Sequence, residues 1–282
     1  MSNVLDAVLA QYEKNQSGGA QTRMSEEERL KKYFACILGD KEKTGQRRIR
    51  ILPTDDGSSP FKEVWYHEIQ VGGKWVKLYD PGKNDNERSP LTEVYDELMA
   101  TGKKTDKDLA PTYKSRKFYV VKVIDRDNEQ DGPKFWRFKH NYKGDGILDK
   151  IIPIWRNKGD ITDVENGRDL IIELVKQKTP KGKEYTNVST IMYDDPCPLS
   201  KDNETAASWI EDELTYMDVY SKKPVEYLEA IAKGEVPKWN VEKGGYDYGD
   251  SSVSTETFGG VSKESIYEDP QSDSEVDGDL PF

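Results

Sequence analysis

The segment from Tyr113 to His140 constrains the fold of this chain more than any other stretch. Residues 118–124 are β-branched and aromatic, an acidic loop ending in Gly132 and Pro133 follows, and residues 135–138 resume the apolar run. This pattern predicts two strands joined by a loop. Because successive side chains of a strand point to opposite faces, we expect one face to carry Lys117, Tyr119, Trp136 and neighbouring cations, while the other face fills a core.

Cations and rings alternate along both predicted strands. The candidate contact residues in this segment are Tyr113, Lys114, Arg116, Lys117, Phe118, Tyr119, Lys134, Trp136, Arg137 and Lys139. Rings stack on unpaired bases and cations sit on phosphates, so the arrangement is typical of a surface that binds single-stranded nucleic acid. The alternative interpretation is an amphipathic hairpin with ordinary core aromatics and a solvated cationic face.

The charge of the chain is distributed unevenly. Its formal net charge is −11, but residues 241–282 hold eleven acids against two lysines, which leaves −2 for the first 240 residues. Residues 103–156 hold fourteen Lys and Arg against eight Asp and Glu. The local excess of +6 around the predicted hairpin therefore favours an anionic partner despite the acidic total.

The remaining pattern predicts a mainly β protein with added helices, built around a five-stranded Greek-key barrel of the OB type. We expect further strands at residues 47–52, 63–71, 74–79, 169–178 and 184–193, with a tight turn at Gly72-Gly73, and helices at 91–100, 203–220 and 224–233, plus a short helix near 147 interrupted by Pro153. Ser25 is the expected N-cap of a helix that leads into the first strand.

Three regions are expected along the chain. Residues 1–22 form an arm and linker, residues 23–236 a nucleic-acid-binding core, and residues 237–282 a disordered acidic tail. The arm places five apolar residues on one helical face and is expected to dock on a neighbouring copy: Val4, Leu5, Val8, Leu9 and Tyr12. The tail ends on Asp279, Leu280, Pro281 and Phe282, an apolar tip that we expect to bind a partner protein.

Compartment and catalysis are constrained mainly by what the sequence lacks. Two cysteines, Cys36 and Cys197, cannot build a disulfide framework, the N-terminus is too polar for a signal peptide, and no run approaches a membrane span, so we expect a soluble intracellular protein. The acidic loop imitates a calcium loop, but its twelfth position is Phe138. No nucleotide-binding loop or catalytic triad is found, and we expect a non-catalytic protein. A protein–protein adaptor whose acidic tail mimics nucleic acid remains the alternative.

Several segments in order resemble the helix-destabilising, single-stranded-DNA-binding protein family of T-even-type bacteriophages. GQRRIRILP, SPF, a strand containing His67, and GGKW are similar to the start of that family's OB domain, and SRKFYVVKVI, GPKFWRFKHN and GILDKI are similar to its central strands and short helix. The resemblance covers roughly residues 1–235. It implies cooperative, sequence-tolerant binding of single strands during replication, recombination and repair, in the cytoplasm of an infected bacterial host.

The resemblance also implies which residues contact DNA. By motif position, the family's DNA-facing side chains fall on Lys114, Arg116, Lys117, Phe118, Tyr119, Trp136, Arg137 and Tyr185, and Arg48, Arg50 and Trp75 from the quoted motifs complete the predicted contacts. The family's zinc site uses one His and three Cys. His67 stands at the His position, but Ser89, Pro90, Leu91 and Thr92 replace the Cys-x-x-Cys pair, so we expect no zinc and no other cofactor.

Both ends of the chain differ from this family: one motif is missing at the N-terminus, and another is added at the C-terminus. The family's basic cooperativity motif is missing from residues 1–12. The terminal DLPF is similar to the tip of bacterial single-strand-binding proteins, which recruits replication and repair enzymes. The expected partners are therefore single-stranded DNA, further copies of the chain, and replication or recombination proteins bound through the tail, with no membrane.

Overall fold

One large sheet holds most of the chain together. The structure is a computed structural model that describes residues 25–248, except for residues 55, 180, 181, 183, 221, 241 and 242. The predicted arm residues Val4, Leu5, Val8, Leu9 and Tyr12 and the predicted tip Asp279, Leu280, Pro281 and Phe282 lie outside the described residues. In chain order the elements are α2 (Glu26–Lys31), β1 (Tyr33–Phe34), β2 (Thr44–Ile51), β3 (Lys62–Val71), β4 (Lys74–Tyr79), α3 (Pro81–Asp85), α4 (Pro90–Ala100), α5 (Lys104–Leu109), η1 (Ala110–Thr112), β5 (Ser115–Asp125), η2 (Glu129–Asp131), β6 (Lys134–Lys139), α6 (Ile147–Lys158), β7 (Arg168–Lys178), β8 (Glu184–Pro196), α7 (Asn203–Ile210), α8 (Tyr216–Val219), α9 (Val225–Ala232), β9 (Lys238–Asn240) and β10 (Gly245–Asp247).

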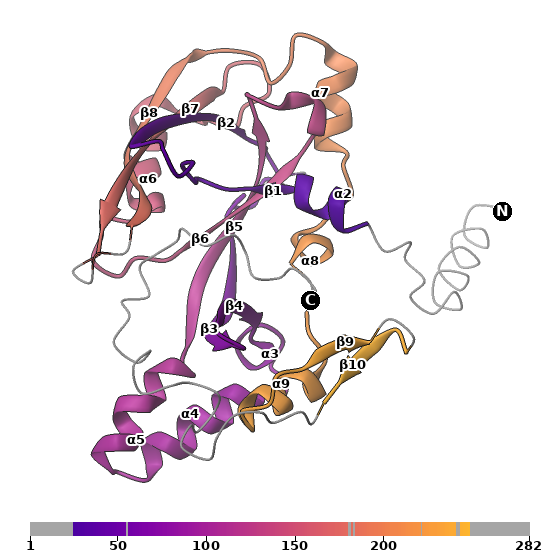
Figure 1. The fold of residues 1–282 in the computed structure, drawn as a ribbon. Coiled ribbons are helices and arrows are strands. Elements are labelled where there is room, and N and C mark those ends of the chain that lie inside the picture. Colours follow the sequence, from indigo (N-terminus) through magenta and orange to yellow (C-terminus); the bar gives the residue numbers. More distant parts are fainter. Residues whose placement is uncertain are drawn as a thin grey trace, which may run out of the picture.

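Strand β5 is the centre of the sheet. Its first half pairs with β3, its last residues pair with β2 along the same edge, and β6 covers its other edge. The path β1–β6–β5–β2–β7–β8 then extends to both sides, and β4 joins through β3. In Figure 1, β5 and β6 run between an upper part with β2, β7, β8 and α6 and a lower part with β3, β4 and α4. The predicted hairpin of β5 and β6 is confirmed.

The upper part encloses the largest core cluster. Ile49 and Ile51 of β2, Leu170 and Ile172 of β7 and Ile191 of β8 are buried there, together with residues of α6. The backbone N–H of Leu38 donates to Thr186 Oγ1 of β8 over 3.1 Å, so the segment after β1 reaches the far end of the sheet. The eight strands of this sheet in the described part of the chain are the seven predicted strand segments and the two-residue strand β1.

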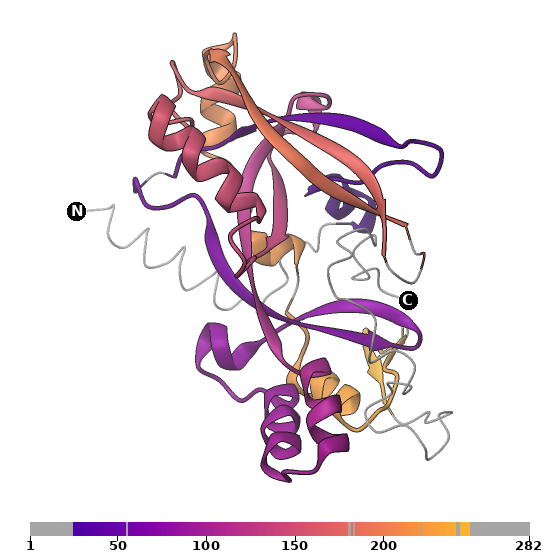
Figure 2. The same ribbon diagram turned by 90° about the vertical axis from the view of Figure 1, so that its left-hand side faces the viewer.

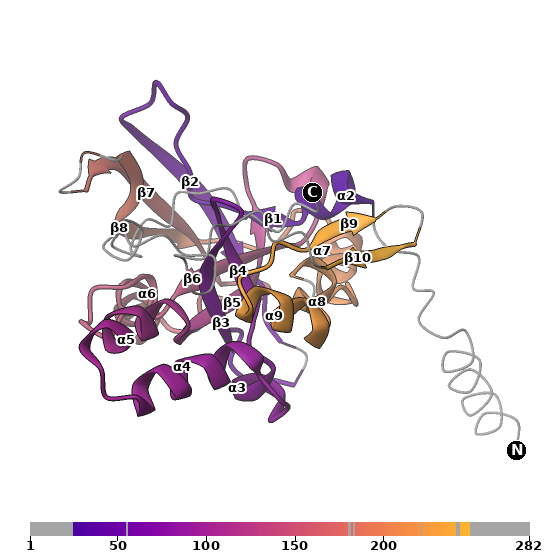
Figure 3. The ribbon, with the colours of Figure 1, turned by 60° about the horizontal axis from the view of Figure 1, so that its bottom comes forward.

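The lower part is the β3–β4 hairpin with its helices. Gly72 and Gly73 have φ angles of +57° and +82°, which allows the two-residue turn, and Val71 pairs with Lys74. Buried residues of α4 and α9, such as Leu91 and Leu228, share a second core with this hairpin. Figure 2 shows the purple β3–β4 hairpin below the orange β7–β8 hairpin, with both extending to the right of the view, and Figure 3 shows α3, α4 and α9 near β3 and β4.

The helices follow the sequence prediction in part, and the short helices α3 and α5 were not predicted. The capping box of Ser25 on α2, the span of α4, and α9 are confirmed. The single helix expected at 203–220 is two helices, α7 and α8, and Pro153 lies inside a continuous α6. Within the described part of the chain, every helix is too short or too polar to cross a lipid bilayer.

A small hairpin lies inside the segment expected to be disordered. Strands β9 and β10 pair antiparallel, and the ring of Tyr246 packs edge-on against Trp239 at 5.1 Å and against Tyr227 of α9 at 4.7 Å. Ring packing on α9 explains how a short, Gly-rich stretch forms strands there. The described residues therefore continue past residue 236 as far as Tyr248.

Candidate nucleic-acid interface

A cleft of about 1190 Å³ lies between the upper and lower parts of the molecule. Its walls come from the segment 30–37, from β3 and β4, from α4, from the start of β5, from β6 and the loop that follows it, and from β8. Two acids, Asp96 and Asp145, line it. The cations that line it number nine: Lys77, Lys83, Lys114, Arg116, Lys117, Arg137, Lys139, Lys143 and Lys150. Such an excess of positive charge in a concave surface attracts a polyanion.

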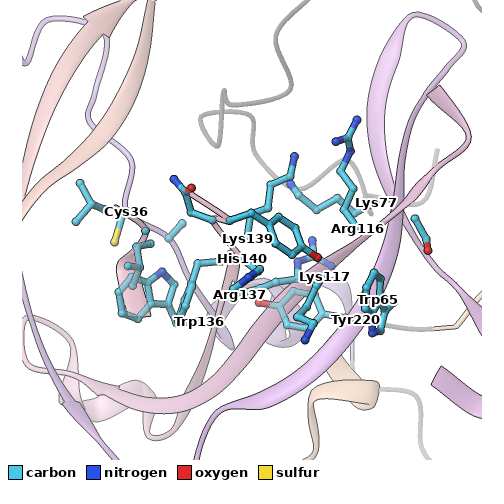
Figure 4. Close-up of a pocket in the computed structure, with 18 of the residues that line it drawn as sticks. Cys36, Trp65, Lys77, Arg116, Lys117, Trp136, Arg137, Lys139, His140 and Tyr220 are labelled. Carbon is cyan, nitrogen blue, oxygen red and sulfur yellow. The ribbon is translucent and has the colours of Figure 1, made fainter. Parts of the chain in front are cut away.

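Trp65 and Lys117 form one wall of this cleft. They lie directly opposite each other in the β3–β5 ladder, with the Lys117 Nζ 5.7 Å from the centre of the indole ring. Lys83 Nζ approaches the same ring at 5.8 Å. The carboxylate of Glu63 accepts a hydrogen bond from Lys117 over 2.9 Å and raises the pKa of this lysine. Figure 4 shows Trp65 and Lys117 close together in the cleft.

Arg137 is held between two tyrosine rings. Its guanidinium carbon lies 4.7 Å from the ring centre of Tyr66 and 4.1 Å from that of Tyr220. The hydroxyl of Tyr220 donates to the carbonyl of Phe135 over 3.1 Å, which fixes the second ring. A guanidinium stacked between rings keeps its plane in one orientation, which suits contact with a planar or forked anion.

An exposed ring stands at the end of β6. Tyr142 is 75% exposed, and its ring packs edge-on against His140 at 4.3 Å. His140 in turn lies with Nδ1 3.2 Å from the hydroxyl of Tyr119. The chain Tyr119–His140–Tyr142 thus links a core ring to a ring that is open to solvent, and Tyr142 is available for stacking on a base.

The structure brings seven of the predicted contacts together in the cleft: Tyr113, Lys114, Arg116, Lys117, Trp136, Arg137 and Lys139. The two aromatic members differ from the prediction. Trp136 is only 2% exposed and packs against Phe34 and Phe138, and Tyr113 is fully buried. These rings form the floor of the cleft and offer no open face for stacking.

Other predicted contacts belong to the core. Phe118 and Tyr119 are buried on opposite faces of β5, because one core cluster covers each face of this strand. Lys134 is buried and ion-paired with Asp125 and Asp131, each at 2.9 Å. Although burial alone lowers the pKa of Lys134, these two carboxylates raise it overall. The expectation of one open face on this hairpin is therefore corrected, since packing covers both faces.

Arg50 is a structural residue. It is 0% exposed, it pairs with Asp169 at 3.3 Å, and its Nη2 donates to the carbonyls of Asp163 and Cys197 over 2.9 and 2.8 Å. A Cβ at Gly167 would lie 2.6 Å from the same Nη2, so the loop passes closely over the guanidinium. Arg50 ties this loop to β2, and we remove it from the candidate contacts.

Three predicted contacts lie away from the cleft lining. Arg48 pairs with Asp194 at 2.6 Å on the β2–β7–β8 part of the sheet. Trp75 is on β4 opposite Gln70, and Tyr185 donates its hydroxyl to Gln177 over 2.8 Å near the β7–β8 turn.

Sequence reasoning missed several residues of the cleft. They are Trp65, Lys77, Lys83, Tyr95, Tyr142, Lys143 and Lys150. One signal was present, because Tyr142-Lys143 continues the ring–cation alternation of β6 into a Gly-containing turn. The others come from β3, β4, α3, α4 and α6, which only the tertiary structure brings to one cleft.

The residues at the position of the family's zinc site form a hydrogen-bonded cluster. His67 Nδ1 donates to the carbonyl of Tyr113 over 2.7 Å, while Nε2 lies 3.5 Å from Asp80 Oδ1 and 3.4 Å from Ser89 Oγ. Asp80 also accepts from the backbone of Gly82 at the start of α3. Within residues 25–248 as described, no three His, Cys, Asp or Glu side chains are grouped to hold a metal ion. One imidazole, one capping carboxylate and a neutral hydroxyl do not fit zinc.

A large sheet with a cationic, ring-edged cleft across its middle defines a nucleic-acid-binding protein. Residues 43–233, more than half of the chain, match the family described as gp32 DNA binding protein like. The chain belongs to this family of DNA-binding proteins. No curated protein matches it.

Proposed function

We propose that the protein binds single-stranded DNA in the cleft, without sequence preference and without catalysis. The observation that carries this proposal is the combination of nine cations with the rings of Trp65, Tyr95 and Tyr142 around one cleft. Cations neutralise phosphates of any sequence, and rings stack on any unpaired base. Family membership supports DNA as the ligand.

The test is equilibrium binding of labelled oligo(dT), with duplex DNA and a mixed-sequence single strand as comparisons. Trp65→Ala and Tyr142→Ala are each expected to weaken oligo(dT) binding by about 1–3 kcal/mol per lost stacked base. Tyr193→Ala is the matched control, because this partly exposed tyrosine does not line the cleft and is not a predicted contact. Affinity should fall with salt at a log–log slope of about −0.7 per phosphate neutralised.

Two results would contradict the proposed binding of DNA in the cleft. If the full chain does not bind oligo(dT) at low salt, the proposal fails and the adaptor alternative takes its place. If Trp65→Ala and Tyr142→Ala both bind as the parent does, DNA binds elsewhere on the protein.

We propose further that the curled part of the sheet is an OB-type barrel and that no zinc supports it. The strand order around β5, the enclosed core under α6 and family membership support the barrel. The donor chemistry around His67 supports the absence of zinc. On this proposal, the His67–Asp80 pair and the burial of α4 hold this region in place, as the metal does in the resembling family.

We also propose that the protein coats single strands cooperatively and recruits partners during phage DNA replication, recombination and repair in the host cytoplasm. The apolar spacing Val4–Leu5–Val8–Leu9–Tyr12 supports docking on a neighbouring copy, and the acidic tail with its Asp279-Leu280-Pro281-Phe282 tip supports recruitment. Deleting residues 1–20 should reduce binding to long strands far more than to a short oligonucleotide. Equal loss on both lengths would place the arm in the core instead.

A further inference from the structure

The carboxylate of Glu68 pairs with cations that line the cleft. Glu68 is in the middle of β3, and its side chain is 11% exposed. It forms ion pairs with Arg116 of β5 and Lys139 of β6, and Lys77 lies directly opposite it in the β3–β4 ladder. All three cations line the cleft. Figure 4 shows Lys77, Arg116 and Lys139 in the part of the cleft above Lys117 and Trp65 in that view.

The pairing of Glu68 with Arg116 leaves a hydrogen-bond donor unused. Arg116 Nε lies 3.3 Å from Glu68 Oε2, yet this buried atom has no hydrogen-bond partner within the described residues. A guanidinium binds the paired oxygens of a carboxylate or of a phosphate in the same forked manner. A phosphate in the cleft can therefore take over the charge of Glu68 and also satisfy the donor that Glu68 does not.

An acid in this place has a cost for binding DNA, because its charge repels the phosphate backbone. When DNA is absent, the same charge offsets the repulsion between the neighbouring cations. Lys77, Arg116 and Lys139 lie on β4, β5 and β6 of the strand order β4–β3–β5–β6, and without the carboxylate of Glu68 on β3 their like charges would repel.

We propose that Glu68 is an internal counterion of the cleft, which holds Arg116 and Lys139 in place until a DNA phosphate displaces it. Glu63 does the same for Lys117, at an exposed position. This rests on the proposed binding of single-stranded DNA and adds how that binding is limited. A cation that is already paired with a carboxylate of the protein neutralises a phosphate less completely, so fewer salt ions leave the DNA on binding. These two acids therefore lower both the affinity and its salt dependence.

The experiment measures oligo(dT) affinity across a salt series for the full chain and for Glu68→Gln. The variant should bind roughly threefold to tenfold more tightly at low salt, with a log–log slope steeper by about 0.7 for each additional phosphate that the freed cations neutralise. Glu63→Gln should change both in the same direction but less, because Glu63 is 53% exposed and its pair is already screened by water.

Glu129→Gln is the matched control. It removes the same charge and breaks a 2.7 Å ion pair with Arg126, but Arg126, unlike Arg116, Lys117 and Lys139, does not line the cleft. Its affinity and slope should equal those of the parent. Glu63→Gln also keeps the test decisive if Glu68→Gln folds poorly in a melting experiment, because its side chain is mostly in solvent.

The outcomes separate cleanly. Parent protein that does not bind oligo(dT) overturns the proposed function itself. Parent protein that binds, with Glu68→Gln and Glu63→Gln showing unchanged or weaker affinity and the parental slope, overturns the counterion role alone. An increase in affinity in Glu129→Gln equal to that in Glu68→Gln also overturns it, because the effect would then reflect net charge rather than position.

Discussion

Tyr113 is a fully buried tyrosine whose hydroxyl has no hydrogen-bond partner within the described residues. Burial raises the pKa of Tyr113 from 10.0 to about 12. A raised pKa means that the folded protein holds this proton more strongly than the unfolded chain does. The contribution to stability is therefore complete below pH 10 and is lost as the pH rises towards about 12.

The variant Tyr113→Phe tests this description. At neutral pH it should be as stable as the parent or more stable, by up to about 1–3 kcal/mol, because it removes an unsatisfied buried hydroxyl. Between pH 10 and 12 it should lose less stability than the parent. Chemical denaturation at several pH values measures both effects. Oligo(dT) affinity should stay the same, and a large loss of affinity would return Tyr113 to the DNA contacts.

At the scale of elements, β3, α3 and α4 meet around the buried pair of His67 and Asp80. Burial by itself would raise the pKa of Asp80, but the hydrogen bond and charge of His67, with hydrogen bonds from Ser89 and Ser115, hold this pKa well below its ordinary value of 3.8. The stability that Asp80 provides is thus present above pH 3.8 and is lost as the pH falls towards its native pKa.

The proposal that no zinc supports this junction predicts a definite response to chelation. Treatment with EDTA should leave the melting temperature and oligo(dT) affinity unchanged, whereas Asp80→Ala should destabilise the protein by about 3–5 kcal/mol, because it leaves His67 buried without its partner. Thermal melting and elemental analysis of the purified protein provide the measurements. Stoichiometric zinc, or melting that depends on zinc, would contradict the prediction. Ser200→Ala, away from this cluster, serves as the control.

At the scale of the whole molecule, opposite charges are separated along the chain. Residues 249–282 carry nine acids and one lysine, while the cleft is lined by nine cations and two acids. A tethered polyanion competes with DNA for a cationic surface at high effective concentration. Because β9 and β10 pack on α9, the tail that is free to compete is expected to start after Tyr248 rather than after Trp239.

Truncation after Tyr248 should therefore tighten oligo(dT) binding by roughly threefold to tenfold at low salt and by much less at high salt, where screening is strong. A full-length variant with the nine acids changed to Asn and Gln should behave like the truncation, which separates charge from length. Removing Phe282 alone should leave DNA affinity unchanged and abolish recruitment of a partner. Unchanged affinity in the truncated protein at low salt would rule out competition by the tail.

The local pattern of the sequence was enough for many elements. Strands β5 and β6, the Gly72-Gly73 turn and the span of α4 were predicted correctly, because each depends on residues close together in the chain. The prediction of one open face on β5 was wrong. Phe34 and Leu38, more than eighty residues earlier in the chain than Tyr119, belong to the core cluster that covers that face, and no alternation within a strand reveals such a distant cover.

The sequence by itself determined the strand and helix segments, the separation of cationic and acidic regions, and the loss of the cysteines that a zinc site of the resembling family needs. Only the tertiary structure decided which cations face the cleft. Lys134 and Arg50 are as basic as Lys139 and Arg116, yet the first two are paired with buried acids in the core. Glu68 and Lys139 are 71 residues apart in the chain. They meet because their strands, β3 and β6, both pair with β5, one on each edge. Charge is a property of a residue, whereas its availability to DNA depends on the strand register and on what packs above it.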